Sequence, residues 1–287
     1  MKRKWGFLPR AIPLPLLPFI LLVGFFFLYP ISKVVYVSFL SNEGHFTLSN
    51  YKTVFTFPYN KGLLGSLQIG LYSALISAIP GTFIAYFIDR RGSIRLKRTI
   101  AALNGVLANT GGLPLAFMFT AAIGRGGALT KILKEFGIDL YAGNFSLGTF
   151  KGILIVYLYF QIPLMVITFS PAITVLGKEL REAAASLGAS QRQFWRKVGA
   201  PLLAPSFIAC FLLLFANGFS AYATAYALTV GNVQLTPLQI AGLLNGNVSA
   251  SQLNLGKALA SMMIVISSLA IIPYLVIQRR VSRWRLQ

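Results

Sequence analysis

Residue types that usually carry catalysis or bind metals are rare in this chain. Its 287 residues include six acids, a single histidine, His45, and a single cysteine, Cys210. A membrane-embedded enzyme would need a nucleophile beside a base, or a cluster of carboxylates and histidines, and the sequence contains neither pattern. It also has no G-x-x-x-x-G-K-S/T loop that would cradle phosphates. We therefore expect no catalytic residue, no metal site and no cofactor bound by the chain itself.

The most informative spacing lies in the segment 177–204, which contains the run Glu182-Ala183-Ala184-Ala185-Ser186-Leu187-Gly188. Apolar residues recur here every three to four positions and glycine commonly follows a helix end, so we expect a short amphipathic helix ending at Gly188. The small alanines beside Glu182 would let the backbone of another protein approach closely. We interpret the segment as a docking surface, with an ordinary surface loop as the alternative.

A second helix is expected to begin at Ser190, because Gln193 follows three residues later in the spacing of a capping box. Two residue pairs define its faces: Phe194 with Val198, and Arg192 with Arg196. Pro201 and Pro205 are expected to end this helix and to begin the next membrane span. The sequence thus predicts a bent, two-helix segment joined directly to a span.

The rest of the chain must place this segment at a membrane surface. Hydrophobic residues make up 56% of the chain and charged residues 11%, which is too apolar for a soluble globule. A span needs about 20 apolar residues, and only a helix satisfies its backbone hydrogen bonds within one segment. The sequence predicts an all-α polytopic membrane protein, with residues 1–287 forming one transmembrane domain. The six uncharged runs of sufficient length are 12–39, 64–88, 99–123, 152–176, 205–230 and 256–277.

The first of these runs is too long for a secretory signal peptide and lacks a small-x-small cleavage site, so we expect it to be retained. Of the 26 Lys and Arg residues, 18 lie in the two tails and in the loops after the second and fourth runs. Short loops rich in Lys and Arg stay cytoplasmic. We therefore expect both termini, with tails 1–11 and 278–287, and the segment 177–204 to be cytoplasmic. The charge of +20 then reflects topology and attraction to membrane lipid, and no nucleic-acid partner is expected.

Helix breakers and longer loops punctuate this layout. Breakers inside the runs are Pro80-Gly81, Gly111-Gly112 with Pro114, Pro163 and Asn217-Gly218. In lipid, such positions mark either broken helices along a watery cavity or close packing through small residues. The loops 40–63 and 124–151 are long enough for short surface helices that rest on the membrane or contact a partner. In the second loop, the residues with helical spacing are Leu129, Ile132, Leu133 and Phe136.

Polar residues near the middle of a span are costly, so we treat them as candidates for a translocation pathway. The alternative is that they hydrogen-bond between helices and hold the bundle together. The candidates are Ser77, Asn109, Thr110, Gln161, Asn217, Tyr222 and Thr224.

The bent segment resembles the EAA loop of binding-protein-dependent ABC importer permeases. That loop reads Glu-Ala-Ala, three residues, Gly, nine residues, then Ile-x-Leu-Pro. Five residues match in register: Glu182, Ala183, Ala184, Gly188 and Pro201. Val198 stands in place of Ile, a conservative change, and Ala200 replaces Leu, which trims one apolar contact.

The resemblance implies a type I ABC importer transmembrane domain in the inner membrane. It implies that the bent segment couples the chain to two ATPase subunits, which use ATP, and that an extracytoplasmic binding protein delivers the solute. It also implies a second permease subunit, with a heterodimer favoured over a homodimer. The residues expected to carry coupling are Glu182, Ala183, Ala184, Gly188, Phe194, Val198 and Pro201.

In general character the chain is most similar to the spermidine/putrescine-type permeases, a group that also includes relatives for phosphonates, ferric iron and thiamine. None of the six acids falls in the middle of a predicted span, so a polyamine would need backbone carbonyls, aromatic faces or a partner subunit. Two alternatives are a stand-alone channel or secondary carrier and, less favoured, a membrane-embedded enzyme. The missing intramembrane acids argue against an ion-driven carrier.

Overall fold

The computed structural model describes residues 16–41, 43–91, 93–143, 145–229, 233–245 and 252–283. Within these ranges the chain is built from helices, with one isolated β-bridge between Leu40 and Phe46. Six helical stretches are long and apolar enough to cross a membrane, so the all-α, six-span prediction is confirmed. The predicted tail 1–11 and the last four residues of the tail 278–287 lie outside the described residues.

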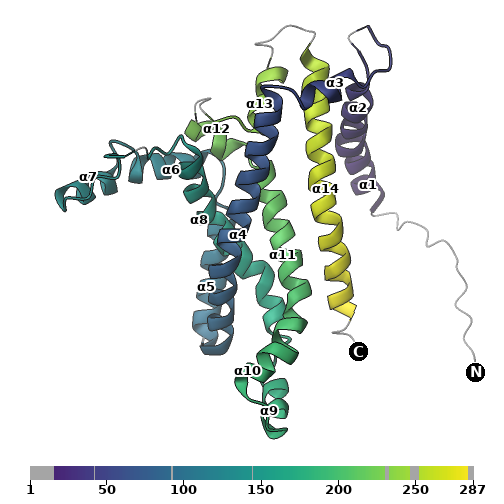
Figure 1. Cartoon of the computed structure of the whole chain (residues 1–287). Helices are drawn as coiled ribbons and strands as arrows, with labels where there is room; N and C mark the ends of the chain where they lie inside the picture. The colour runs from purple at the N-terminus through teal and green to yellow at the C-terminus, as the bar shows by residue number, and fades with distance from the viewer. Residues whose placement is uncertain are drawn as a thin grey trace, which may run out of the picture.

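Four of the predicted spans are confirmed to within a few residues. The first consists of α1 (Leu17–Val23), a π-helical turn (Gly24–Leu28) and α2 (Tyr29–Ser38). The second, fourth and sixth are α4 (Tyr59–Arg91), α8 (Phe150–Ile173) and α14 (Leu253–Arg283). Helices α4 and α8 pack together with α11 (Ala200–Ser220) at the centre of the bundle, and α14 lies against α11 (Figure 1).

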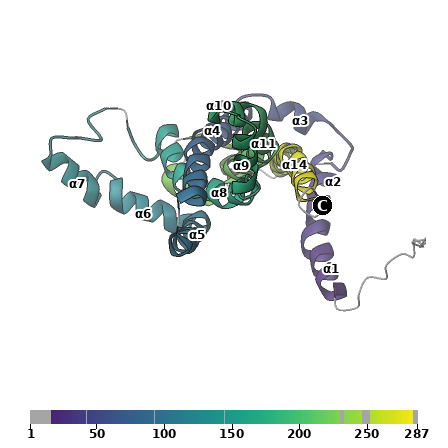
Figure 2. The same cartoon turned by 90° about the horizontal axis from the view of Figure 1, so that it is seen from below.

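The predicted third span, 99–123, is wrong as a single helix. It is divided into α5 (Ile94–Asn109), which packs along α8, and α6 (Leu113–Ile123), which turns sideways from the bundle (Figures 1 and 2). The break falls at Gly112, whose φ of 75° suits glycine, and Pro114 lies in the first turn of α6. The third apolar stretch accordingly runs over Leu113–Glu135.

The predicted fifth span, 205–230, is also divided. It comprises α11 (Ala200–Ser220) and α12 (Ala223–Thr229), with extended backbone at Ala221 between them. The breakers Pro80-Gly81, Pro163 and Asn217-Gly218 lie inside continuous helices. Two of their glycines instead permit close packing: a Cβ atom on Gly81 would lie 2.6 Å from the Cβ atom of Met165, and one on Gly218 would lie 2.6 Å from the Oγ atom of Ser73.

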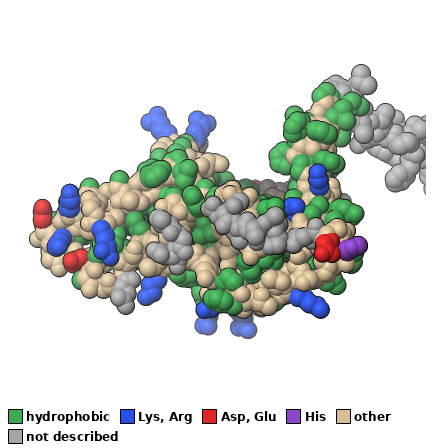
Figure 3. Space-filling model, turned by 90° about the horizontal axis from the view of Figure 1, so that it is seen from above, with side chains coloured by type: hydrophobic (Ala, Val, Ile, Leu, Met, Phe, Trp, Pro, Cys, Tyr) green, Lys and Arg blue, Asp and Glu red, His purple; other side chains and the backbone are tan. Residues whose placement is uncertain are grey.

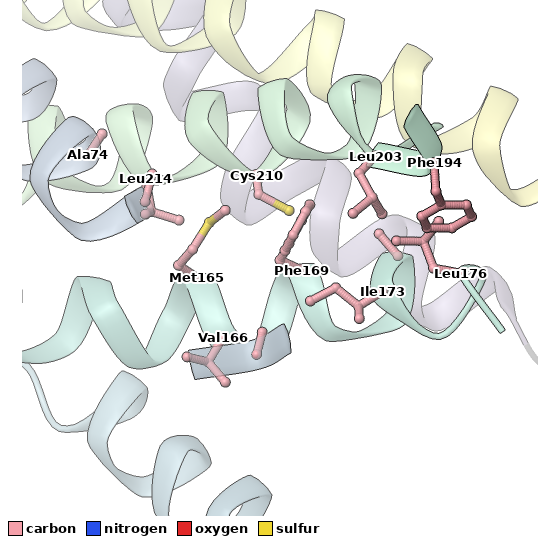
Figure 4. Packing of buried hydrophobic residues seen from close by; sticks show 13 residues of the cluster. Ala74, Met165, Val166, Phe169, Ile173, Leu176, Phe194, Leu203, Cys210 and Leu214 are labelled. Carbon is pink, nitrogen blue, oxygen red and sulfur yellow. The ribbon is translucent and has the colours of Figure 1, made fainter. Parts of the chain in front are cut away.

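Buried apolar side chains of α4, α8 and α11 form the core that extends toward one end of the bundle (Figure 4). This first core cluster includes Ala74, Met165, Val166, Phe169, Ile173, Leu176, Phe194, Leu203, Cys210 and Leu214. Many large apolar side chains on the outside of the spans are exposed, as expected when lipid replaces water as the solvent. Cys210 is buried in this cluster.

Both long loops contain the expected short helices, α3 (Ser49–Val54) and α7 (Ala128–Glu135), and α13 (Thr236–Leu244) precedes α14. Helices α6 and α7 form an arm that projects from the bundle (Figure 2). The apolar side chains of Leu129 and Ile132 on α7, and of Phe136 directly after it, are exposed. When the molecule is seen from above the view of Figure 1, charged side chains lie toward its edges, including the end of the arm (Figure 3).

Candidate functional site

The segment 177–204 folds as an elbow at the far end of the bundle. Helix α9 (Lys178–Ser186) is followed by a turn, by α10 (Gln191–Phe194) and by a π-helical turn (Trp195–Gly199) that leads into α11. Helices α9 and α10 lie beyond the ends of α4 and α5 (Figure 1). The two helices predicted for this segment are therefore confirmed.

Glycine sets the angle of the elbow. Gly188 has a φ of 75°, the left-handed conformation that glycine adopts at little cost. Its N–H donates to the carbonyl of Ala185 at 2.9 Å, and the N–H of Ala189 donates to the carbonyl of Ala184 at 3.0 Å. This pair of hydrogen bonds is a Schellman motif, which satisfies carbonyls at the helix end. The chain therefore leaves α9 in a fixed direction.

The second helix begins with the predicted capping box. The backbone N–H of Gln193 donates to the Ser190 hydroxyl at 3.3 Å, and the backbone N–H of Ser190 donates to the Gln193 amide oxygen at 2.8 Å. The predicted helix end at Pro201 and Pro205 is wrong, since the helical stretch runs without a break from Gln191 to Ser220. Pro201, which has no backbone N–H to donate, lies in the first turn of α11, directly after the π-helical turn. Pro205 is accommodated inside the helix.

Apolar contacts anchor the elbow to the spans. Phe194 is only 6% exposed, and Val198, Ala184 and Trp195 are half-buried against the same first core cluster. The ring of Trp195 meets the ring of Tyr86 on α4 edge-on at 5.4 Å. Phe194 and Val198 therefore face the bundle, so any part that they have in coupling is to hold the elbow in place.

The opposite face of the elbow is open to a partner. Glu182, Ala183 and Ala185 are exposed, and Leu187, at the tip, is 88% exposed. An isolated exposed leucine is ordinary, but here it adjoins small side chains on a rigid turn, an arrangement that suits insertion into a groove. Of the predicted coupling residues, Glu182, Ala183, Gly188 and Pro201 are exposed, whereas Ala184, Phe194 and Val198 are wholly or partly covered.

Three of the predicted pathway residues are buried between helices. The amide N–H₂ of Gln161 donates to the Ser73 hydroxyl at 3.1 Å and to the Leu214 carbonyl at 3.0 Å, joining α8 to α4 and α11. Ser77 is fully buried and donates within α4 to the Ser73 carbonyl. Thr224 accepts from the Gly112 N–H at 2.9 Å, which ties α12 to the break before α6.

The other four predicted pathway residues are at least partly accessible. Asn109 is exposed, and Thr110, Asn217 and Tyr222 are intermediate. Asn109 and Thr110 donate to carbonyls of their own helix, those of Gly105 and Val106. The structure therefore does not gather the seven predicted residues at one surface.

Reasoning from the sequence missed several buried polar residues on these helices, among them Ser73 and Asn104. Asn104 of α5 is 9% exposed, and its amide nitrogen has no hydrogen-bond partner among the described residues. It lines a cavity of about 420 Å³ between α4, α5 and α8, together with Ser170 and Thr174. The signal available in the sequence was that Asn104 lies five residues before Asn109 in the same apolar run. Among the described residues there is no group of three or more His, Cys, Asp or Glu side chains that could hold a metal.

Comparison with known proteins gives a consistent family. Residues 81–286 match the family described as "Binding-protein-dependent transport system inner membrane component". The spermidine/putrescine transport system permease protein PotB of Haemophilus influenzae is 30% identical over 221 residues, which cover 73% of this chain and 77% of that protein. The trehalose transport system permease protein SugB of Mycobacterium tuberculosis is 26% identical over 237 residues, covering 82% and 78%.

Solved structures agree on the fold. A chain of a bacterial ABC transporter involved in the import of the acidic polysaccharide alginate aligns over 94% of both chains, with a TM-score of 0.67 and 15% identity. A chain of the MetNI methionine ABC transporter, in an inward-facing conformation, aligns over 79% of this chain and 99% of its own length, with a TM-score of 0.51 and 17% identity. The described helices thus have the fold of ABC importer transmembrane domains.

Proposed function

This chain belongs to the binding-protein-dependent transport system inner membrane components and is a permease subunit of an ABC importer, and from that premise we propose that its elbow, α9 and α10, couples it to ATPase subunits. The observation that carries the proposal is the pairing of an exposed tip, formed by Ala183, Gly188 and Leu187, with a buried anchor at Phe194. A rigid elbow continuous with α11 can convert a push or pull on its tip into a shift of the span.

The complete importer would contain two ATPase subunits, which use ATP, a second permease subunit and an extracytoplasmic binding protein. The elbow, both termini and the end of α14 would lie on the cytoplasmic side of the inner membrane. We favour a heterodimer of permeases over a homodimer, because permeases similar to this chain commonly pair with a different one. Co-purification of one or of two permease chains with the ATPase tests that choice.

The substrate is a small solute received from the binding protein. Names of the relatives include transport systems for trehalose, spermidine/putrescine and thiamine, so they agree on transport and differ in solute. All six acids are described, and none lies in the middle of a span. The acid nearest to the middle of a span is Asp89, in the last turn of α4, and its carboxylate pairs with Lys97 at 3.3 Å. A polyamine would therefore be neutralised outside this chain, which favours solutes that need no carboxylate inside the span. Mass spectrometry of the ligand retained by the purified binding protein identifies the solute.

Substitutions at the elbow tip test the coupling role. We expect Glu182→Lys and Gly188→Asp to abolish solute uptake in vesicles while ATP hydrolysis by the assembled importer continues, because both place charge on the docking face. Asp tolerates the left-handed conformation of Gly188 better than most residues, so the effect of Gly188→Asp is chiefly one of charge and bulk.

Two matched variants serve as controls. Glu43→Lys makes the same charge change at an exposed acid remote from the elbow, and Gly188→Ala introduces backbone strain of about 1 kcal/mol without charge. Both should transport at close to the parental rate. Parental uptake by Glu182→Lys and Gly188→Asp in membranes with normal levels of each protein would refute coupling through the elbow.

A further inference from the structure

A small cavity with two arginines lies between the end of α4 and the elbow. Its volume is about 170 Å³. Side chains from three parts of the fold line it: Tyr86 and Arg90 of α4, Arg181 and Ala184 of α9, and Phe194 and Trp195 at the start of the helical stretch that follows α9. None of the predicted functions of the elbow requires these arginines.

The two guanidinium groups lie against the same tyrosine ring. The Cζ atom of Arg90 lies 5.5 Å from the centre of the Tyr86 ring, and that of Arg181 lies 5.9 Å from the same centre. The ion pairs found among the described residues, Lys97–Asp89 and Lys134–Asp139, involve neither arginine. Like charges in this position repel, so an anion in the cavity would stabilise them.

An unsatisfied donor points to the same conclusion. The Nε atom of Arg181 is buried and has no hydrogen-bond partner in the described part of the chain. Leaving a buried donor unpaired costs about 1–3 kcal/mol, and more for a charged group. A bound anion with two acceptor oxygens would pair with the planar guanidinium fork.

We propose that this cavity binds the phosphate of an anionic phospholipid head group through Arg90 and Arg181. Its volume is below the roughly 300–1,000 Å³ of pockets that enclose whole drug-sized ligands, which suits a head-group phosphate better than a nucleotide. The cavity is at the end of a span, where head groups lie, and tyrosine and tryptophan, which line it here, are enriched at that level. Basic pockets between spans on the cytoplasmic side bind lipid head groups in this way. The lipid would join α4 to the elbow, and the proposal holds whatever partner docks at the elbow tip.

The test measures lipid retained by the full-length chain. The experiment compares three proteins: the wild type, the double variant Arg90→Gln/Arg181→Gln and the control Arg98→Gln. Each is purified from nanodiscs that contain equal amounts of phosphatidylglycerol and phosphatidylcholine. Native mass spectrometry then counts the lipids that each protein retains. Arg98 is an exposed arginine on α5 near the same end of the bundle. We expect each arginine removed from the cavity to lower phosphatidylglycerol retention by about fivefold, and the control to retain as much as the wild type.

Equal retention by the double variant and the wild type would overturn the proposal, as would equal losses in the double variant and the control. A competition arm separates lipid from free phosphate. If millimolar inorganic phosphate in pure phosphatidylcholine nanodiscs stabilises the wild type as much as phosphatidylglycerol does, the site takes the free anion, and the lipid assignment is overturned. Should the double variant fail to fold, Arg181→Lys keeps the charge but removes the guanidinium fork. It should lose phosphatidylglycerol retention, and unchanged retention would count against the proposal.

Discussion

At the scale of single residues, Gln161 shows how a polar group in a span can hold helices together. Its amide N–H₂ joins α4 and α11 to α8, whereas its amide oxygen is buried without a partner. Hydrogen bonds between membrane helices average about 0.6 kcal/mol, and an unpaired buried oxygen costs about as much or more. The net stabilisation from the amide is therefore small, and the volume of the side chain matters more.

This balance leads to a prediction for two substitutions. Gln161→Leu, which keeps the volume, should change the free energy of unfolding by less than about 1 kcal/mol, whereas Gln161→Ala should cost about 2–4 kcal/mol through the cavity that it leaves. The two variants are compared by their apparent Tm values, which are measured on detergent-solubilised protein at one scan rate. If Gln161→Leu lowers Tm as much as Gln161→Ala, the hydrogen bonds dominate. If it keeps Tm but loses uptake, Gln161 acts on the solute as the pathway hypothesis requires.

Several residue-level properties could be predicted from the sequence because they depend on neighbours in the chain. The capping box of Ser190 and Gln193 is local, and so is the glycine that ends α9. The burial of Gln161 and Ser77 could not be predicted, because it depends on which face of α8 or α4 meets the other helices. The orphan donor of Arg181 also arises from a contact between segments about 90 residues apart in the chain.

At the scale of elements, the proposed coupling role requires that the base of the elbow is held in place. Phe194 supplies that hold by inserting its ring into the first core cluster (Figure 4). The sequence predicted that Phe194 and Val198 share a face but not that this face is turned inward. The same limit explains the third and fifth spans, because hydropathy alone does not distinguish a helix that crosses the membrane from two shorter helices joined at Gly112 or Ala221.

The anchor can be weakened without touching the tip. Phe194→Ala should destabilise the protein by about 3–5 kcal/mol, and it should increase protease cleavage near Gly188 at temperatures where the spans remain folded. Phe136→Ala, at a phenylalanine that is 78% exposed directly after α7, should change stability by less than about 0.5 kcal/mol. Limited proteolysis with mass spectrometry of the fragments measures both. Equal cleavage rates in the two variants would show that the first core cluster does not hold the elbow.

At the scale of the whole molecule, the directions of the helices define two ends. Helices α4, α8 and α14 run toward the end that carries the elbow, and α11 runs away from it (Figure 1). The elbow and the end of α14 therefore share a side, and the loop containing Glu43 belongs to the other. The excess of Lys and Arg on the elbow side predicts that this side faces the cytoplasm.

Labelling of single cysteines tests this orientation. Cys210 is the chain's one cysteine, so Cys210→Ala gives a background for Leu187→Cys at the elbow tip and Glu43→Cys at the opposite end, both at exposed positions. A membrane-impermeant maleimide should modify Leu187→Cys in inverted vesicles only and Glu43→Cys in right-side-out vesicles only. Modification of Leu187→Cys from outside would place the elbow beyond the reach of any cytoplasmic ATPase. Modification of both from one side would contradict the arrangement of the helices itself, because α2 and α4 meet the loop of Glu43 at one end and α9 extends from the other.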